Sequence, residues 1–379
     1  MLTYDALLAL DRSLKDEQVL SVYIAGAPDD LALYRTWRVD LDHALAEQRR
    51  RGAQAPAASR AAFDSAVAAL EETLRGWTPP PRGRGWVAFI TQGGVVHQGA
   101  LPRSPGTVAA WRRGILAAPH VRALEEERSV LVARVDARTA ALHRVHDHAV
   151  ALVDEWYRDR PSGDAPHLGD APRMGFHGGT RGRTAHDAHE RSQREATAHL
   201  VADVAERIAR EAARGGWIVL AGNDRVGQMV IDRLPTAVAA RTRGGAVLPA
   251  DAGPSRVLEV AMQGAAALRD AEYCTRLRAI ADASNGRGRA VRGDAETTRA
   301  LENGQVDELF LTPHFVDTHP DASEQAMHAA FDQGARVHVI DGPSAEQLER
   351  LGGIAAVLRY PLNGSGGVAA ARQALGGAG

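Results

Sequence analysis

Glycine, arginine and histidine gather between residues 158 and 184, and together these side chains suit contact with nucleic acid. The stretch ends in His177-Gly178-Gly179-Thr180-Arg181-Gly182-Arg183-Thr184, and arginines recur beyond it at Arg191 and Arg194. Guanidinium groups bind phosphates and an imidazole can stack on a base, so the segment is a candidate RNA contact. A solvated loop without a partner is the alternative that the residues alone leave open.

A second basic cluster consists of Arg49, Arg50 and Arg51, followed by Gly52-Ala53-Gln54-Ala55-Pro56. Helical patterns flank this segment on both sides, which predicts a tip where two helices meet. The basic side chains of the chain are almost all arginines, Lys15 being the one lysine. Because guanidinium groups bind phosphates bidentately, this tip is a second candidate RNA contact.

Other chemically active side chains do not complete a site. His143, His146 and His148 are close in sequence, and His186 and His189 share one helix face, a spacing that metal ligands use. Exposed histidines are common on charged helices, however, so we expect no metal. Cys274 lies in a helical run without a nearby histidine or acid, and we expect it to pack rather than react. We predict no catalytic residue and no cofactor.

Composition limits the classes of protein to which the chain can belong. Its 379 residues predict two or three domains, with 45% hydrophobic and 24% charged residues as in soluble proteins. A net charge of −2 argues against general coating of nucleic acid, although local basic patches remain compatible with RNA binding. We find no secretory signal and no long apolar run, and the single cysteine fits a reducing compartment. We therefore expect a cytoplasmic protein.

Alternating helix and strand patterns place these candidate residues on an α/β fold of three domains. Residues 1–122 combine strand patterns at 20–26 and 86–91 with the two helices of the basic tip. Residues 127–250 begin with a hairpin over 129–146, continue through the polar loop at 158–184, and then read as a helix from about 185 to 214. Residues 255–375 alternate helices, the first over 262–283, with strands in the pattern of an α/β/α sandwich.

Two stretches of the third segment carry a family resemblance. Gly288-Arg-Ala-Val-Arg-Gly-Asp-Ala-Glu-Thr-Thr-Arg-Ala-Leu-Glu-Asn-Gly-Gln-Val-Asp-Glu-Leu-Phe-Leu311 and Leu351-Gly-Gly-Ile-Ala-Ala-Val-Leu-Arg-Tyr360 resemble the C-terminal domain of archaeo-eukaryotic release factors and Pelota. The resemblance implies a three-domain release-factor/Pelota-like architecture. Its middle domain would be ribonuclease-H-like, and its C-terminal domain an α/β/α sandwich like a small kink-turn-binding ribosomal protein.

The resemblance also implies what the candidate residues do, and here the chain departs from the family. The family carries Gly-Gly-Gln in the loop before the long middle helix, where this chain has Gly182-Arg183-Thr184, and Gly-Gly-Gln occurs nowhere in its sequence. Stop-codon readers carry Asn-Ile-Lys-Ser at the helix–helix tip, which this chain lacks as well. Ester hydrolysis and stop-codon decoding are therefore both in doubt.

We predict a noncatalytic, monomeric ribosome-binding factor that occupies the A site of idle or stalled ribosomes, as hibernation factors do in bacterial branches of the superfamily. The family implies delivery by a translational GTPase, which in bacteria suggests elongation factor Tu. One alternative is a peptidyl-tRNA hydrolase that rescues ribosomes with a rearranged loop. Another is a stress protein that kept the fold and binds a different RNA or protein.

Overall fold

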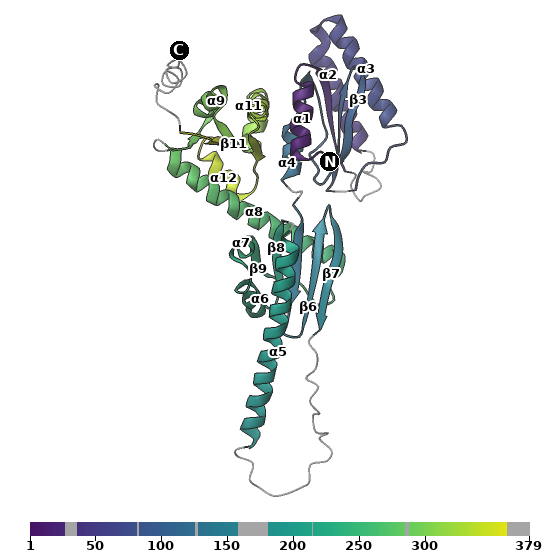
Figure 1. Ribbon diagram of the computed structural model, residues 1–379. Helices are drawn as coiled ribbons and strands as arrows, with labels where there is room; N and C mark the ends of the chain where they lie inside the picture. The colour runs from purple at the N-terminus through teal and green to yellow at the C-terminus, as the bar shows by residue number, and fades with distance from the viewer. Residues whose placement is uncertain are drawn as a thin grey trace, which may run out of the picture. The chain divides into compact units, whose positions relative to one another are not determined.

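The computed structural model describes residues 1–26, 36–81, 83–125, 128–157, 181–213, 215–284 and 288–361, with the side chains of 181–190 left out. It divides the chain into two compact units (Figure 1). Unit 1 joins Met1–Glu127 to Asp270–Gly379, and unit 2 is Arg128–Arg269. The first and third segments of the sequence thus share one unit, into which the middle segment is inserted. The three-domain boundaries themselves stay a prediction.

The first segment of unit 1 is a four-stranded antiparallel sheet with helices on both faces. The sheet has the order β3-β2-β1-β4, from β1 (Gln18–Ala25), β2 (Gly85–Thr91), β3 (Gly94–Leu101) and β4 (Val108–Arg113). The helices are α1 (Tyr4–Leu14), α2 (Thr36–Arg51), α3 (Ala57–Thr73) and α4 (Ala118–Leu124), and the turn η1 (Gly52–Gln54) follows α2.

Strand alternation explains why both faces of this sheet are covered, because successive side chains point to opposite sides. Leu20, Val22 and Ile24 of β1 share an apolar cluster with side chains of α2 and α3. Val19 and Tyr23, on the other face, share a cluster with α1 and α4. Two helices on a small sheet were predicted and are confirmed, whereas α1, β4 and α4 were not predicted.

The third segment contributes a second four-stranded sheet to unit 1, with the order β10-β13-β11-β12. Its strands are β10 (Ala290–Arg292), β11 (Val306–Leu311), β12 (Arg336–Val339) and β13 (Ile354–Leu358). Its helices are α8 (Pro254–Ser284), which begins in unit 2, α9 (Asp294–Glu302), α10 (Pro313–Thr318), α11 (Pro320–Asp332) and α12 (Pro343–Glu349). Side chains of α8 and α12 pack on one face, and those of α9, α10 and α11 on the other, so the predicted sandwich is confirmed.

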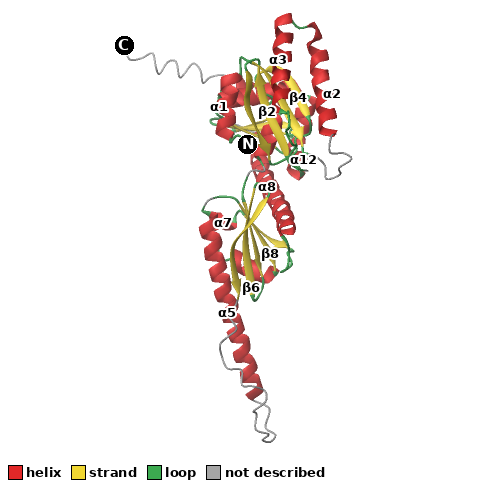
Figure 2. Cartoon of the chain, turned by 90° about the vertical axis from the view of Figure 1, so that its right-hand side faces the viewer, coloured by secondary structure: helices red, strands yellow, loops and turns green. Residues whose placement is uncertain are grey.

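Unit 2 is a mixed five-stranded sheet with the order β7-β6-β5-β8-β9. Its strands are β5 (Val130–Val135), β6 (Thr139–His146), β7 (Ala149–Tyr157), β8 (Trp217–Gly222) and β9 (Thr242–Ala246). Its helices are α5 (Arg181–Ala212), α6 (Asp224–Ile231), α7 (Thr236–Ala239) and the start of α8. Figure 2 shows α5 lying along the sheet and continuing beyond the ends of its strands.

Two helix starts differ from the sequence-based expectation. Helix α5 begins at Arg181 rather than near 185, so Arg181–Thr184 form its first turn instead of the end of the loop. Helix α8 begins at Pro254 rather than 262. Both differences have one cause: extending a helix that has already nucleated costs little, so a long helix tolerates a polar or glycine-containing first turn. None of the helices in the described ranges is long and apolar enough to cross a membrane.

A candidate RNA contact at the α2–α3 tip

The three arginines of the predicted tip lie together at the end of α2, where α2 and α3 meet (Figure 1). Their side chains are well exposed, between 61% and 72%. Arg50 and Arg51 both pair with Glu47, which lowers the pKa of that carboxyl group, and Arg49 pairs with Asp64 of α3 at 2.9 Å. Three guanidinium groups thus face two carboxylates, which leaves the tip with a positive charge. Basic residues also stabilise the C-terminal end of a helix, where the helix dipole is negative. This effect explains the same arginine cluster without any contact with RNA.

A cavity of about 520 Å³ opens beside this tip, a size typical of small-molecule sites. Phe63 of α3 and Trp111 of β4 contribute aromatic walls, with ring centroids 5.6 Å apart in an edge-to-face arrangement. Arg49 lies over the Phe63 ring at 5.7 Å, and the exposed Arg60 contributes a second guanidinium group. Small residues at positions 52, 53, 55 and 57 complete the wall.

The polar groups of the cavity are suited to binding rather than to bond breaking. The backbone N–H of Trp111 donates to Gln48 Oε1 at 3.2 Å, which ties β4 to the end of α2. The indole Nε1 of Trp111 is buried and has no hydrogen-bond partner among the described residues. Aromatic faces beside guanidinium groups suit bases and phosphates. The carboxylate of the lining, Asp64, is paired with Arg49.

The tip was predicted from the sequence, but the cavity was not. Helical patterns and three consecutive arginines located Arg49, Arg50 and Arg51. Trp111 was missed because β4 was not predicted, and only the pairing of β4 with β1 brings this indole beside α2. The aromatic residue between apolar and basic neighbours in Val108–Arg113 was the available signal.

The second candidate RNA contact lies largely outside the described residues. His177, Gly178 and Gly179 lie outside the described residues. Arg181, Gly182, Arg183 and Thr184 form the first turn of α5, and their side chains are not described. Arg191 is exposed on α5. Contact of these residues with RNA therefore stays a prediction.

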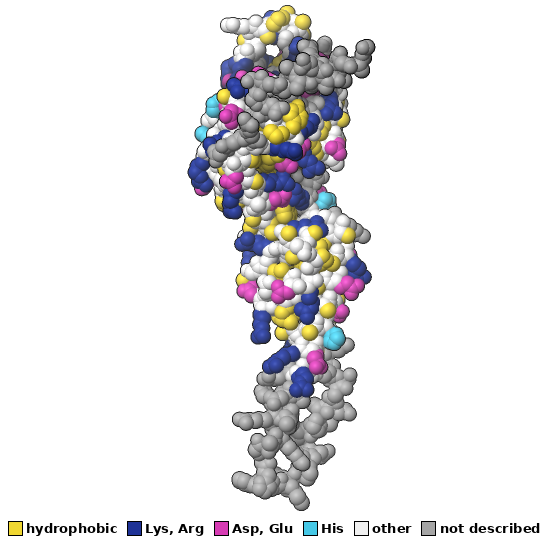
Figure 3. Space-filling view, turned by 60° about the vertical axis from the view of Figure 1, so that its left-hand side comes forward, with side chains coloured by type: hydrophobic (Ala, Val, Ile, Leu, Met, Phe, Trp, Pro, Cys, Tyr) yellow, Lys and Arg dark blue, Asp and Glu magenta, His cyan; other side chains and the backbone are white. Residues whose placement is uncertain are grey.

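The remaining candidates are the histidines and Cys274. Within the described ranges, no three His, Cys, Asp or Glu side chains could hold a metal. Cys274 does have an acidic neighbour, contrary to expectation, because Asp270 is one helical turn away with its Oδ2 3.9 Å from Sγ. Burial and this carboxylate raise the pKa of the thiol, which disfavours the nucleophilic thiolate. On the face drawn in Figure 3, basic and acidic side chains are interspersed, so that face presents no uniform basic surface.

Comparison with known proteins gives these features a family context. A model of bacterial archaeo-eukaryotic release factor family 10 matches residues 117–266, and a model of eRF1 domain 3 matches residues 277–362. The search of curated proteins finds no match.

Solved structures similar to the chain come from the same group of proteins. Pelota of Archaeoglobus fulgidus is 15% identical, with 74% of this chain and 80% of that chain covered and a TM-score of 0.39. Dom34 of S. cerevisiae is 13% identical, with 74% and 81% covered and a TM-score of 0.42. The archaeal termination factor aRF1 is 18% identical, with 95% and 99% covered and a TM-score of 0.27. The two family models match in chain order, so the chain is a bacterial archaeo-eukaryotic release factor-like protein.

Proposed function

We propose that the protein is a noncatalytic ribosome-binding factor that occupies the A site of idle or stalled ribosomes. The observation that carries the proposal is the replacement of the family's tripeptide by Gly182-Arg183-Thr184 in a chain without any Gly-Gly-Gln. Ester hydrolysis would need the second glycine for close backbone approach and the glutamine to order water near the oxyanion donor. Arginine and threonine supply neither, whereas a guanidinium group can still bind ribosomal RNA.

The descriptions of similar proteins support a ribosomal role for this protein. An archaeal Pelota is described as ribosome-bound together with ABCE1, and Dom34 as a translation termination-like factor that interacts with Hbs1. By analogy, the partners of this protein are the ribosome and a translational GTPase such as elongation factor Tu, with the protein acting as a cytoplasmic monomer. The role resembles that of the hibernation factor Balon, which protects idle ribosomes under stress.

The α2–α3 tip would supply one RNA contact in this role. Its exposed guanidinium groups suit phosphates, and the aromatic cavity beside them suits an unstacked base. The tip lacks the decoding tetrapeptide of release factors, so the contact would position the protein without reading a stop codon.

Co-sedimentation with vacant ribosomes tests this contact. The double variant Arg50→Gln, Arg51→Gln should bind more weakly, and the slope of log affinity against log salt should fall by about 0.7–0.9 per lost phosphate contact. The double variant Arg75→Gln, Arg256→Gln is a matched control, because both side chains are exposed and each pairs with a glutamate three residues away, as Arg50 does. Equal binding and equal slopes for the two double variants would refute the role of the tip.

Peptide release from ribosome-bound peptidyl-tRNA separates the proposal from its enzymatic alternative. We expect no release above the uncatalysed rate at saturating protein. Release that disappears in Gly182→Ala would instead identify a peptidyl-tRNA hydrolase with a rearranged loop. A protein that does not pellet with ribosomes at low salt would have kept the fold for a different partner.

A further inference from the structure

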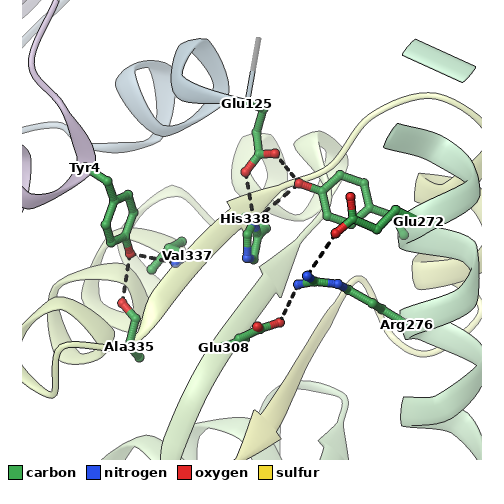
Figure 4. A network of polar contacts seen from close by, with 9 residues as sticks. Tyr4, Glu125, Glu272, Arg276, Glu308, Ala335, Val337 and His338 are labelled. Carbon is green, nitrogen blue, oxygen red and sulfur yellow. Dashed lines mark hydrogen bonds and ion pairs between the residues drawn. The ribbon is translucent and has the colours of Figure 1, made fainter. Parts of the chain in front are cut away.

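The first and third segments of unit 1 are held together by a shared core. Leu7 of α1 and Phe331 of α11 belong to one cluster of buried residues, and the ring of Tyr4 meets Phe331 edge to face at 6.0 Å. The Tyr4 hydroxyl donates to the carbonyl of Ala335 at 2.8 Å and accepts from the N–H of Val337 at 2.7 Å (Figure 4). These contacts join residues more than 300 positions apart.

Charged groups are buried within this contact, which makes it unlike an ordinary apolar interface. Glu324 of α11 is 1% exposed, and its carboxylate accepts the N–H groups of Ala117 and Ala118 at 2.9 and 3.1 Å. One helical turn later, His328 Nδ1 lies 2.6 Å from Oδ1 of Asp11 in α1, which is also 1% exposed. His328 Nε2 lies 3.7 Å from Glu324 Oε2, so the imidazole stands between two buried carboxylates.

Three elements supply the charges that face His328. Asp11 comes from α1, Glu324 from α11 itself, and Arg112 from β4, with its Nη1 4.0 Å from Glu324 Oε2. Lys15 and Asp332 form an exposed ion pair farther out. With a protonated imidazole, two positive groups balance the two carboxylates. Loss of that proton would leave a buried, uncompensated negative charge, which is costly.

Protonation of His328 is favoured at this position. Burial by itself would lower the pKa of His328, but the adjacent carboxylate of Asp11, with the charge of Glu324, outweighs burial and raises it. A raised pKa in the folded protein means that the contribution to stability is complete below about pH 6.5, the ordinary histidine value, and is lost as pH rises through the folded pKa. Burial raises the pKa of the Glu324 carboxyl group as well. The stability that its protonated form contributes is therefore lost as pH rises above the ordinary value of 4.5.

We propose that Asp11, His328 and Glu324 form a proton-controlled latch, which holds the first segment against α11 while the imidazole is charged and loosens when it is neutral. Because the first segment carries the α2–α3 tip, the latch sets how rigidly that tip is fixed to the third segment. The inference stands on the contacts within unit 1 and does not depend on the proposed function.

Hydrogen exchange in the full-length protein tests the latch. The amides of residues 115–118 and 120–123 and of Val337 report on the contact, and their protection is measured at pH 6.0–9.0 relative to an unfolded reference at each pH. Protection in the wild type should fall with rising pH, by up to tenfold for each unit by which the folded pKa of His328 exceeds its ordinary value. Burial lowers the pKa of both His97 and His120, so both titrate at lower pH than an ordinary histidine.

Variants of His328 test whether this residue causes the pH dependence of the protection. His328→Gln should give lower protection that no longer varies with pH, whereas His314→Gln, at an exposed histidine of α10, should retain the wild-type profile. If His328→Gln fails to fold, the double variant Asp11→Asn, His328→Gln replaces the charged pair with neutral amides and should also remove the pH dependence. A wild-type pH profile in either His328 variant would overturn the latch, as would a wild-type protein whose protection does not change with pH.

Discussion

At the scale of single residues, His120 shows how burial determines a protonation state. The imidazole is fully buried, its Nε2 lies 3.3 Å from the Leu2 carbonyl, and burial lowers its pKa to about 4. A depressed folded pKa means that the unfolded chain takes up a proton first as pH falls. Stability should therefore decrease between pH 6.5 and 4, by up to about 3 kcal/mol for this one group.

Chemical denaturation of wild type and His120→Leu at pH 7 and pH 4.5 measures this loss. The variant should lose less stability than the wild type on acidification, because the group that titrates only in the unfolded chain is gone. The exposed His314→Leu serves as control and should follow the wild type. Equal losses in His120→Leu and wild type would show that His120 does not control acid stability.

At the scale of elements, α8 fits closely on the unit 2 sheet at Gly264. A Cβ atom there would lie 2.3 Å from Cγ2 and 3.1 Å from Cγ1 of Val219, a buried residue of β8. Val219 cannot turn away easily, because a β-branched side chain has few rotamers. Overpacking of this kind costs about 1–3 kcal/mol, which exceeds the gain of up to about 1 kcal/mol from replacing a helical glycine by alanine.

Urea denaturation should therefore find Gly264→Ala less stable than wild type. Gly253→Ala is the control, since a Cβ atom at that position meets no atom within 4 Å. Val219→Ala removes the obstructing methyl groups, so the double variant should lose less than the sum of the two single changes. Strict additivity would mean that the helix and strand do not meet at this point.

The elements also show what sequence patterns can and cannot predict. Strands such as β1 and helices such as α2 and α3 were predicted because their apolar spacing is regular over several turns or residues. Short elements such as β10 and α10 were missed, because three to six residues carry too little periodicity. Strand β7 was missed because it is an edge strand whose residues are exposed or half-buried.

The same limit applied to the candidate site. Arg49–Arg51 could be located because the helix end and its charges are local features. The cavity could not, because Trp111 reaches it only through the pairing of β4 with β1. The contacts of Asp11 with His328 lie beyond local patterns for the same reason. Local patterns thus predicted many of the helices and strands but not the long-range contacts.

At the scale of the whole molecule, the chain leaves unit 1 and returns to it at neighbouring points. The hydroxyl of Tyr273, just after the return, donates to Glu125, just before the departure. His338 Nδ1 lies 2.8 Å from the same carboxylate (Figure 4). Helix α8 spans the return: its first half packs through Val257 and Val260 in unit 2, and its second half through Leu277 in unit 1. Each unit has its own buried clusters, so each contains the apolar core that independent folding needs.

We therefore expect unit 1 to fold without unit 2. Replacing residues 128–269 by a flexible linker of about six Gly and Ser residues, which reaches roughly 12–15 Å, should join Glu125 to the second half of α8 without strain. Circular dichroism should show cooperative unfolding. The amides of residues 115–118 and 120–123 should keep their wild-type hydrogen-exchange protection, because Glu324 and His328 still meet Ala117 and Asp11 within the remaining chain. The same deletion carrying His328→Gln should lose that protection while remaining folded. If the variant that lacks residues 128–269 aggregates or unfolds without cooperativity, unit 1 needs unit 2 in order to fold. The two units would then form a single folding unit.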